Sequence, residues 1–278
     1  MKTIGVFDSG FGGLTVLHEL IPLIPGARYL YLGDTARLPY GSKSRETIAR
    51  YAISSARFLA DQGAEMLVIA CNTATALALD DIREALPIPI VGVVEPGAQA
   101  ALTAATESRA AIAGSHVLVL ATAATTQSGA YSRTLGALRL RATEKACPLL
   151  VPLVEEGWLD SSAHAAVTLD VLRIYLLEAF EQAPEANVLL LGCTHYPLLK
   201  PLIETTLKNL HHPMQIIDSA AATARAVAAL VPASKTSGES SRPECVFYAT
   251  DSIEKFQRLG SAFLHQPLSQ VELVDLGG

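Results

Sequence analysis

Two cysteines stand at the ends of apolar runs, where a thiol could exchange a proton with a bound ligand. Cys71 follows MLVIA and precedes NTATAL, and Cys193 follows VLLLG and precedes THYPLL. Each apolar run reads as a buried strand, and each polar stretch after it reads as the start of a helix. Backbone N–H groups at a helix start favour a thiolate, whereas burial in apolar surroundings opposes ionisation. Both positions therefore indicate thiols that take part in chemistry, against the alternative of small buried apolar residues.

The two cysteine segments form part of a longer repeat. An earlier strand-like run in each half also ends in small hydroxyl residues, in IGVFDSGFGG from Ile4 and in VLVLATAATTQSG from Val117. The halves are therefore interpreted as two related α/β units. A pseudo-twofold relation between them would point both sulfurs at one crevice from opposite sides. One thiol could then remove a proton from one face of a carbon while the other returns a proton to the opposite face, as a racemase requires.

Each thiol needs a neighbour that sets its protonation state, because one must act as thiolate while the other acts as thiol. His195 lies two residues after Cys193 and is the candidate there. Asp8, at the end of the first strand-like run, is the candidate beside Cys71 if the first and third strands of that half are neighbours. The alternatives are a hydrogen-bonding residue at a helix start for His195 and an N-cap or turn residue for Asp8.

Two short turns could bind a small anion. DSGFGGLT has neither a complete G-x-G-x-x-G nor the G-K-[ST] of a phosphate loop, so a turn whose amides bind a carboxylate is the simpler interpretation. LPYGSKS offers Tyr40 and the amides of Gly41 and Ser42 before a helix. A capped turn with no ligand is the alternative for this second segment.

Strand-like and helical segments alternate along the chain and predict an α/β fold with mostly parallel sheets. We expect two pseudo-symmetric α/β domains, the first formed by residues 1–96 and 210–278 and carrying Cys71, the second formed by residues 97–209 and carrying Cys193. Ligands of open α/β sheets bind beyond the carboxyl ends of the strands, where both cysteines fall. The clearest loop by composition is KTSGESSRPE, residues 235–244. The predicted strands are TIGVF, RYLYLGD, EMLVIA, IPIVGV, HVLVLAT, ANVLLLG, MQIID and CVFYAT.

Composition excludes several classes of protein. The formal charge is −6 and Lys and Arg form no cluster, which argues against nucleic acid as a partner. No apolar stretch is long enough to span a bilayer and the start of the chain has no presequence pattern, so we expect a cytoplasmic protein. The four cysteines are scattered without a C-x-x-C, which disfavours a disulfide framework or a metal site.

Taken together, these motifs resemble the cofactor-independent glutamate racemases along almost the whole chain. The segments that carry the resemblance occur in the family's order, and the two cysteine motifs are its most specific part. They are DSGFGGLTVL, LGDTARLPYGSKS, CNTATA, VVEPG, PLVEEGW, GCTHYPLL, IIDSA and FYATDS.

The resemblance implies interconversion of L- and D-glutamate, with D-glutamate supplied to peptidoglycan and with no cofactor or metal. It implies that Cys71 takes the α-proton from the D isomer and Cys193 from the L isomer, supported by Asp8 and His195 respectively. It further implies two α/β domains with the active site in the cleft between them, and a homodimer. Positions that match the family's substrate contacts are Ser9, Tyr40, Gly41, Asn72, Thr73, Thr125 and Thr194, with Pro39, Ser42 and Glu155 as additional candidates.

The chain departs from the family pattern at Ala124 to Thr126, where many members have Gly-Thr-Val, so Thr125 is a weaker candidate contact. Three other functions remain open. An aspartate racemase would use the same two thiols with a smaller pocket. A binding or regulatory protein would bind glutamate without exchange at the α-carbon. A redox pair would need the two sulfurs at bonding distance, which leaves no room for a substrate carbon.

Overall fold

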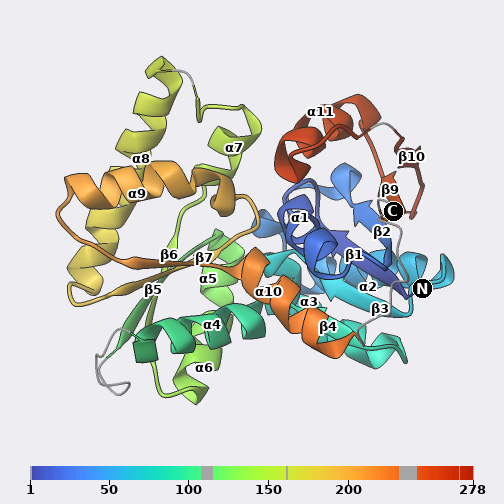
Figure 1. Ribbon diagram of the computed structural model, residues 1–278, viewed down its shortest axis with the longest axis horizontal. Helices are drawn as coiled ribbons and strands as arrows, with labels where there is room; N and C mark the ends of the chain where they lie inside the picture. Colours follow the sequence, from blue (N-terminus) through green and yellow to red (C-terminus); the bar gives the residue numbers. More distant parts are fainter. Residues whose placement is uncertain (1, 108–114, 161, 232–242, 269, 278) are drawn as a thin grey trace. The chain divides into compact units, whose positions relative to one another are not determined.

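Two parallel β-sheets organise the chain, as the computed structural model shows for residues 2–107, 115–160, 162–231, 243–268 and 270–277 (Figure 1). The first sheet has six strands in the order β10-β9-β2-β1-β3-β4, and the second has four in the order β6-β5-β7-β8. All the strand pairings recorded in these two sheets are parallel. The predicted α/β class with mostly parallel sheets is therefore confirmed.

The strands of the first sheet are β1 (Thr3–Asp8), β2 (Arg28–Gly33), β3 (Met66–Ile69), β4 (Ile90–Gly92), β9 (Cys245–Ala249) and β10 (Glu272–Leu273). The strands of the second are β5 (His116–Ala121), β6 (Arg141–Ala146), β7 (Val188–Gly192) and β8 (Gln215–Asp218). The helices are α1 (Leu14–Leu23), η1 (Thr35–Arg37), η2 (Tyr40–Ser42), α2 (Arg45–Asp61), α3 (Asn72–Ala85), α4 (Val94–Glu107), α5 (Ala123–Ser128), α6 (Ala130–Ala137), α7 (Leu150–Glu155), α8 (Ser162–Gln182), η4 (Tyr196–Leu199), α9 (Lys200–Asn209), α10 (Ser219–Leu230) and α11 (Ile253–Leu264).

The two sheets share one strand order. In the first sheet β1 lies between β2 and β3, with β4 outside β3, and in the second β5 lies between β6 and β7, with β8 outside β7. Cys71 follows β3 and Cys193 follows β7, so the cysteines come after equivalent strands. This correspondence agrees with the internal repeat seen in the sequence.

Strands buried on both faces explain the continuous apolar runs of the sequence. In β2, Leu30 and Leu32 belong to the core cluster that includes residues of α2 and α3. Tyr31, between them, points to the other face, where its ring lies 6.0 Å from that of Phe256 on α11. All three β2 side chains are 0% exposed, so the strand has no polar face.

The second sheet is also a middle layer. Figure 1 shows α8 and α9 on one side of it and α4 and α6 on the other. Contacts between α8 and α9, and between α4 and α6, agree with this arrangement. Turns and the short helices α5 and η4 follow the carboxyl ends of β5 and β7, where Cys193 lies.

The chain divides into two compact units, residues Met1–Val93 with Ala220–Gly278 and residues Val94–Ser219. The sequence placed the return to the first unit at residue 210, whereas β8 pairs with β7 and so belongs with the second unit. The first crossing falls at Val93 and Val94 rather than after residue 96 because α4 packs on β7 and β8. Of the predicted loop at 235–244, all but the last two residues lie outside the described part of the chain.

Within the described residues, no helix has the length and apolar character needed to cross a bilayer.

Candidate active site

Cys71 is the N-cap of α3 and is almost fully buried, with 5% of its surface exposed. Its sulfur accepts a hydrogen bond from the amide of Ala74 at 3.4 Å and donates to the Ser9 hydroxyl at 3.4 Å. The extended backbone of Cys71 and the polar residues after it begin the helix, as the sequence predicted. The thiol therefore lies at a helix start, next to a residue that follows β1.

Burial raises the pKa of the Cys71 thiol to about 11, and the negative charge of Asp8 acts in the same direction. The hydrogen bonds with Ser9 and with the Ala74 amide lower the pKa of the thiol but do not cancel the effect of burial. The sequence left open which effect dominates. Burial does, so Cys71 holds its proton at neutral pH.

Asp8 ends β1, which pairs directly with β3, so the condition set for its role beside Cys71 is met. Its carboxylate accepts a hydrogen bond from the amide of Gly10 at 2.8 Å. The turn needs glycine next to it, because a Cβ on Gly13 would lie 2.5 Å from the Cβ of Asp8 and 2.8 Å from that of Ala70. The GFGG segment thus packs α1 closely against this carboxylate.

The LPYGSKS segment forms the short helix η2 and carries a buried tyrosine. Tyr40 is 1% exposed, and its hydroxyl donates to the Asp34 carboxylate at 2.6 Å. Gly41 is half-buried, while Pro39 and Ser42 are exposed. The hydroxyl of Tyr40 donates its hydrogen bond to Asp34, so any hydrogen bond from this residue to a ligand must come from its backbone.

Asn72 and Thr73 form the first turn of α3 and are buried, with 3% and 4% of their surfaces exposed. They follow Cys71 directly, so they lie at the same carboxyl edge of the sheet. The first unit thereby brings the predicted residues Asp8, Ser9, Cys71, Asn72 and Thr73 together, with Tyr40 close enough to Cys71 for their charges to interact.

Cys193 is joined to a histidine and a glutamate in the second unit. Its sulfur lies 4.0 Å from Nδ1 of His195, and Nε2 of His195 lies 3.2 Å from Oε1 of Glu155. Glu155 is the last residue of α7, and the exposed fractions of Cys193 and His195 are 5% and 7%. The glutamate that the sequence could only align to the family is thus a direct partner of the histidine.

The contact with Glu155 favours one tautomer of His195. If Nε2 carries the hydrogen and donates it to the carboxylate, Nδ1 presents a lone pair toward the sulfur of Cys193. Such a cysteine, histidine and carboxylate series can move a proton off the thiol. The geometry therefore supports Cys193 as the thiol that loses its proton first.

Thr194 and Thr125 complete the predicted residues of this unit. Thr194 is 5% exposed and follows Cys193 directly. Thr125 is fully buried in α5, and its hydroxyl lies 3.0 Å from that of Thr122, the N-cap of the same helix. Ala121, the last residue of β5, pairs with Gly192, the last residue of β7. The start of α5 and Cys193 therefore lie at adjacent strand ends.

The two cysteines differ locally, which the sequence did not predict. Cys71 caps an α-helix, whereas Cys193 precedes a turn and the 3-10 helix η4, and α9 begins only at Lys200. Pro197 lies in the first turn of η4, where a missing N–H is tolerated. Of these two thiols, only Cys71 therefore lies at the N-terminus of an α-helix, where backbone N–H groups favour the thiolate.

The sequence did not indicate two further residues near Tyr40, Asp34 and Thr250. Asp34 is fully buried and accepts hydrogen bonds from the hydroxyls of Tyr40 and of Thr250, the latter at 3.0 Å. Asp34 follows β2 and Thr250 follows β9, and these strands are paired. Their position at strand ends was visible in RYLYLGD and CVFYAT, but the pairing of strands so far apart in the sequence was not.

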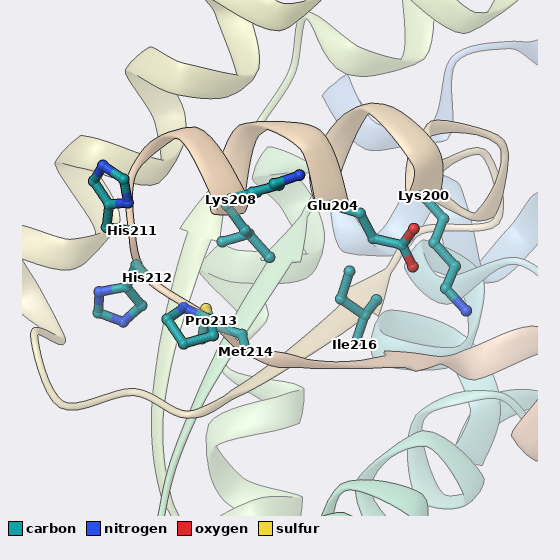
Figure 2. Close-up of a pocket in the computed structure, with 9 residues that line it drawn as sticks. Lys200, Glu204, Lys208, His211, His212, Pro213, Met214 and Ile216 are labelled. Carbon is teal, nitrogen blue, oxygen red and sulfur yellow. The ribbon is translucent and has the colours of Figure 1, made fainter.

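A separate cavity of about 570 Å³ lies between α9 and the segment that leads into β8 (Figure 2). Figure 2 shows Lys200, Glu204 and Lys208 on the helix and His211 at its end, and the strand segment opposite carries His212, Pro213, Met214 and Ile216. Its lining contains none of the predicted site residues. In the described part of the chain, no group of three or more His, Cys, Asp and Glu side chains is arranged to hold a metal ion.

The fold and these residues define a protein with a doubled α/β architecture in which a buried thiol follows each of the equivalent strands β3 and β7. The sequence pattern of the Asp/Glu/Hydantoin racemase family matches residues 15–227. The chain belongs to this family, which confirms the resemblance inferred from the motifs.

Known relatives agree with the assignment. A glutamate racemase of Koribacter versatilis (strain Ellin345) is 49% identical, with 99% of this chain and 98% of the relative aligned. The crystal structure of glutamate racemase from Francisella tularensis in complex with D-glutamate matches with a TM-score of 0.84 and 34% identity, covering 99% of this chain and 98% of that one. An aspartate racemase homologue from Pyrococcus horikoshii matches with a TM-score of 0.56 and 20% identity, covering 83% and 99%, which shows a shared fold alone.

Proposed function

We propose that this protein is an amino-acid racemase that interconverts L- and D-glutamate with Cys71 and Cys193 as its two acid–base groups. The observation that carries the proposal is the equivalent place of two buried thiols at the ends of β3 and β7, each beside a group that can influence its proton. Glutamate as the substrate is supported by the relatives, which are glutamate racemases at up to 49% identity. Aspartate racemases share only the fold.

The surroundings of the two thiols favour one starting arrangement. Burial and the Asp8 charge keep Cys71 as a thiol, while His195 offers a nitrogen lone pair near Cys193. In this arrangement Cys193 passes its proton to Nδ1 of His195 and becomes the base. It is therefore ready to accept the α-proton of L-glutamate.

The reaction then needs one proton on each face of the α-carbon. The Cys193 thiolate takes the α-proton, and the electron pair of the broken C–H bond stays on the substrate as a carbanion. Cys71 donates its proton to the opposite face, which gives D-glutamate and leaves Cys71 as a thiolate beside Asp8. The reverse reaction starts from that state.

The remaining predicted residues hold the substrate. The half-buried hydroxyl of Ser9 and the buried polar groups of Asn72, Thr73, Thr125 and Thr194, with the backbone of Pro39 to Ser42, offer hydrogen bonds to two carboxylates and an amino group. By the family resemblance, both thiols act on one bound glutamate. By the same resemblance, we propose that the protein supplies D-glutamate for peptidoglycan, acts in the cytoplasm and is a homodimer.

The test is racemisation by the full chain with single thiols removed. The native protein should convert either enantiomer of glutamate in D2O with deuterium at the α-carbon of the product, and aspartate should be converted far more slowly. Cys71→Ala and Cys193→Ala should each nearly abolish conversion, because each direction uses one thiol as base and the other as acid. Near-normal turnover by either variant would contradict the assignment.

Cys245→Ala is the matched control. Cys245 is a half-buried cysteine on β9 that lies outside the two thiol sites, so its removal should leave turnover unchanged. Glutamate that binds without any α-deuterium exchange would instead identify a binding protein. Conversion of aspartate as fast as glutamate would favour the aspartate alternative.

A further inference from the structure

Asp34 is a buried carboxylate to which the proposed reaction gives no role. It is 0% exposed, and three side chains reach it. The Tyr40 hydroxyl donates to Oδ2 at 2.6 Å, the Thr250 hydroxyl donates to Oδ1 at 3.0 Å, and the Arg37 guanidinium lies 3.4 Å from Oδ2. A buried carboxylate with this many partners is strongly oriented, because each partner restricts its rotation and stabilises its charge.

The same carboxylate is tied to both neighbouring strand ends. The amide of Asp34 donates to the carbonyl of Asp8 at 3.0 Å, which connects it to the end of β1. The Thr250 hydroxyl also accepts from the amide of Ala36 at 2.9 Å, which connects the turn after β2 to the end of β9. Asp34 thus has a fixed position relative to the edge of the sheet that carries Cys71.

Tyr40 connects Asp34 to the segment around Tyr40 itself. Its ring packs 6.3 Å from Phe7 and 6.1 Å from Tyr51, and its carbonyl accepts from the amide of Lys43 at 3.1 Å. We propose that Asp34 is the positioning residue for the substrate-binding segment Pro39–Ser42, acting through its hydrogen bond to Tyr40. Asp34 touches no substrate in this arrangement.

Arg37 provides a second connection to the carboxylate. Its guanidinium lies beside Asp34, 4.6 Å from the ring centre of Tyr51, and donates a hydrogen bond to the carbonyl of Gly277. The stretch before Gly277 is itself held, since Leu276 packs against the core cluster and its carbonyl accepts from the Ser54 hydroxyl at 3.4 Å. The segment Val274–Gly277 therefore supports the arginine that neutralises Asp34.

The inference rests on the proposed function, because the purpose of the segment is to bind glutamate. Loss of a hydrogen bond to a charged group corresponds to a change of about tenfold to hundredfold in an equilibrium constant. Asp34→Ala should therefore raise the KM for glutamate by about tenfold or more while kcat falls much less. Asp34→Asn, which keeps an acceptor for the Tyr40 hydroxyl, should restore most of the KM.

A double-variant comparison separates positioning from general loosening. Tyr40→Phe should raise KM like Asp34→Ala, and the two changes combined should raise it no further, since they remove the same bond. Tyr29→Phe is the matched control, because its buried hydroxyl donates to the carbonyls of Leu20 and Ile24 at 3.1 and 2.9 Å, away from this segment. It should lower Tm and leave KM unchanged.

Amide hydrogen exchange gives a measurement that does not depend on catalysis. In the full-length protein, Asp34→Ala should speed exchange of the amides between residues 38 and 45, and Tyr29→Phe should not. If the native protein fails to racemise glutamate, the proposed function is wrong and this exchange alone decides the inference. If Asp34→Ala does not fold, Asp34→Asn and Tyr40→Phe decide it. An active, folded Asp34→Ala with normal KM and normal amide exchange would overturn the inference.

Discussion

The protonation state of Cys71 offers the sharpest test of the proposed chemistry. Burial, with the Asp8 charge, raises the pKa of this thiol to about 11 from an ordinary value of 9.0. At pH 8 about one Cys71 in a thousand is then a thiolate, compared with about one in ten for the ordinary thiol. Since alkylating agents react with the thiolate, the reaction of Cys71 at pH 8 should be slowed by about a hundredfold by ionisation alone.

The assay is the rate of iodoacetamide modification of Cys71 as a function of pH, read from its peptide by mass spectrometry. The rate should rise about tenfold per pH unit up to about pH 10 without levelling off. Limited access to a buried sulfur lowers the absolute rate at every pH, so the shape of the profile is the diagnostic quantity. Asp8→Asn removes a negative charge and should move the profile to lower pH by less than the total rise, because burial is the larger cause.

A plateau below pH 9 in the native protein would refute this reasoning. It would mean that the N-terminus of α3 and the Ser9 hydrogen bond outweigh burial, so that Cys71 rests as a thiolate. Cys71 would then be the base in the resting protein, and the proposed starting arrangement would be reversed. An Asp8→Asn profile that moves to higher pH would separately exclude the charge effect assigned to Asp8.

Three other perturbations follow from the structure. Glu155→Ala removes the partner of Nε2 of His195, so we expect kcat to fall by different factors in the two directions. The values of kcat/KM stay equal for the two enantiomers because the enantiomers have equal free energy. Equal losses of kcat in both directions would remove the role assigned to Glu155. Gly13→Ala should lower the free energy of unfolding by about 1–3 kcal/mol through overpacking, whereas Gly136→Ala, with open space at its Cβ, should leave it unchanged or raise it, as urea unfolding would measure. Burial raises the pKa of Cys147 from 9.0 to about 12. The stability that the buried thiol contributes is therefore complete below pH 9 and is lost as the pH rises toward 12. The difference in unfolding free energy between the native protein and Cys147→Ala should narrow from pH 9 to 11.

The central strands and the longest helices could be predicted from the sequence because their patterns are strong. Strands buried on both faces, such as β2 and β7, consist of uninterrupted apolar residues, and α2 has a Ser44 N-cap with a clear apolar face. The strand β6 was missed because RATEKA is polar. It lies at the edge of its sheet, where charged side chains are accommodated.

The local environment of the thiols could be predicted only in part. The sequence placed Asp8 beside Cys71 on the condition that the first and third strands are neighbours, and β1 does pair with β3, while His195 is near Cys193 in sequence. The position of Glu155 depends on where α7 packs against the turn after β7, and no local pattern encodes that. The direction of the Cys71 pKa depended on the degree of burial, which only the folded structure supplies.

The discontinuity of the first unit has a consequence for synthesis on the ribosome. Residues 94–219 form one continuous unit, whereas β2 acquires its outer neighbour β9 only when residues 245–249 have been made. At about 5–20 residues per second, the synthesis of the residues between β2 and β9 takes on the order of ten to forty seconds. Throughout it, the nascent chain presents β2 as an apolar strand with one unpaired edge, so we expect this strand to be the part of the molecule most dependent on chaperones.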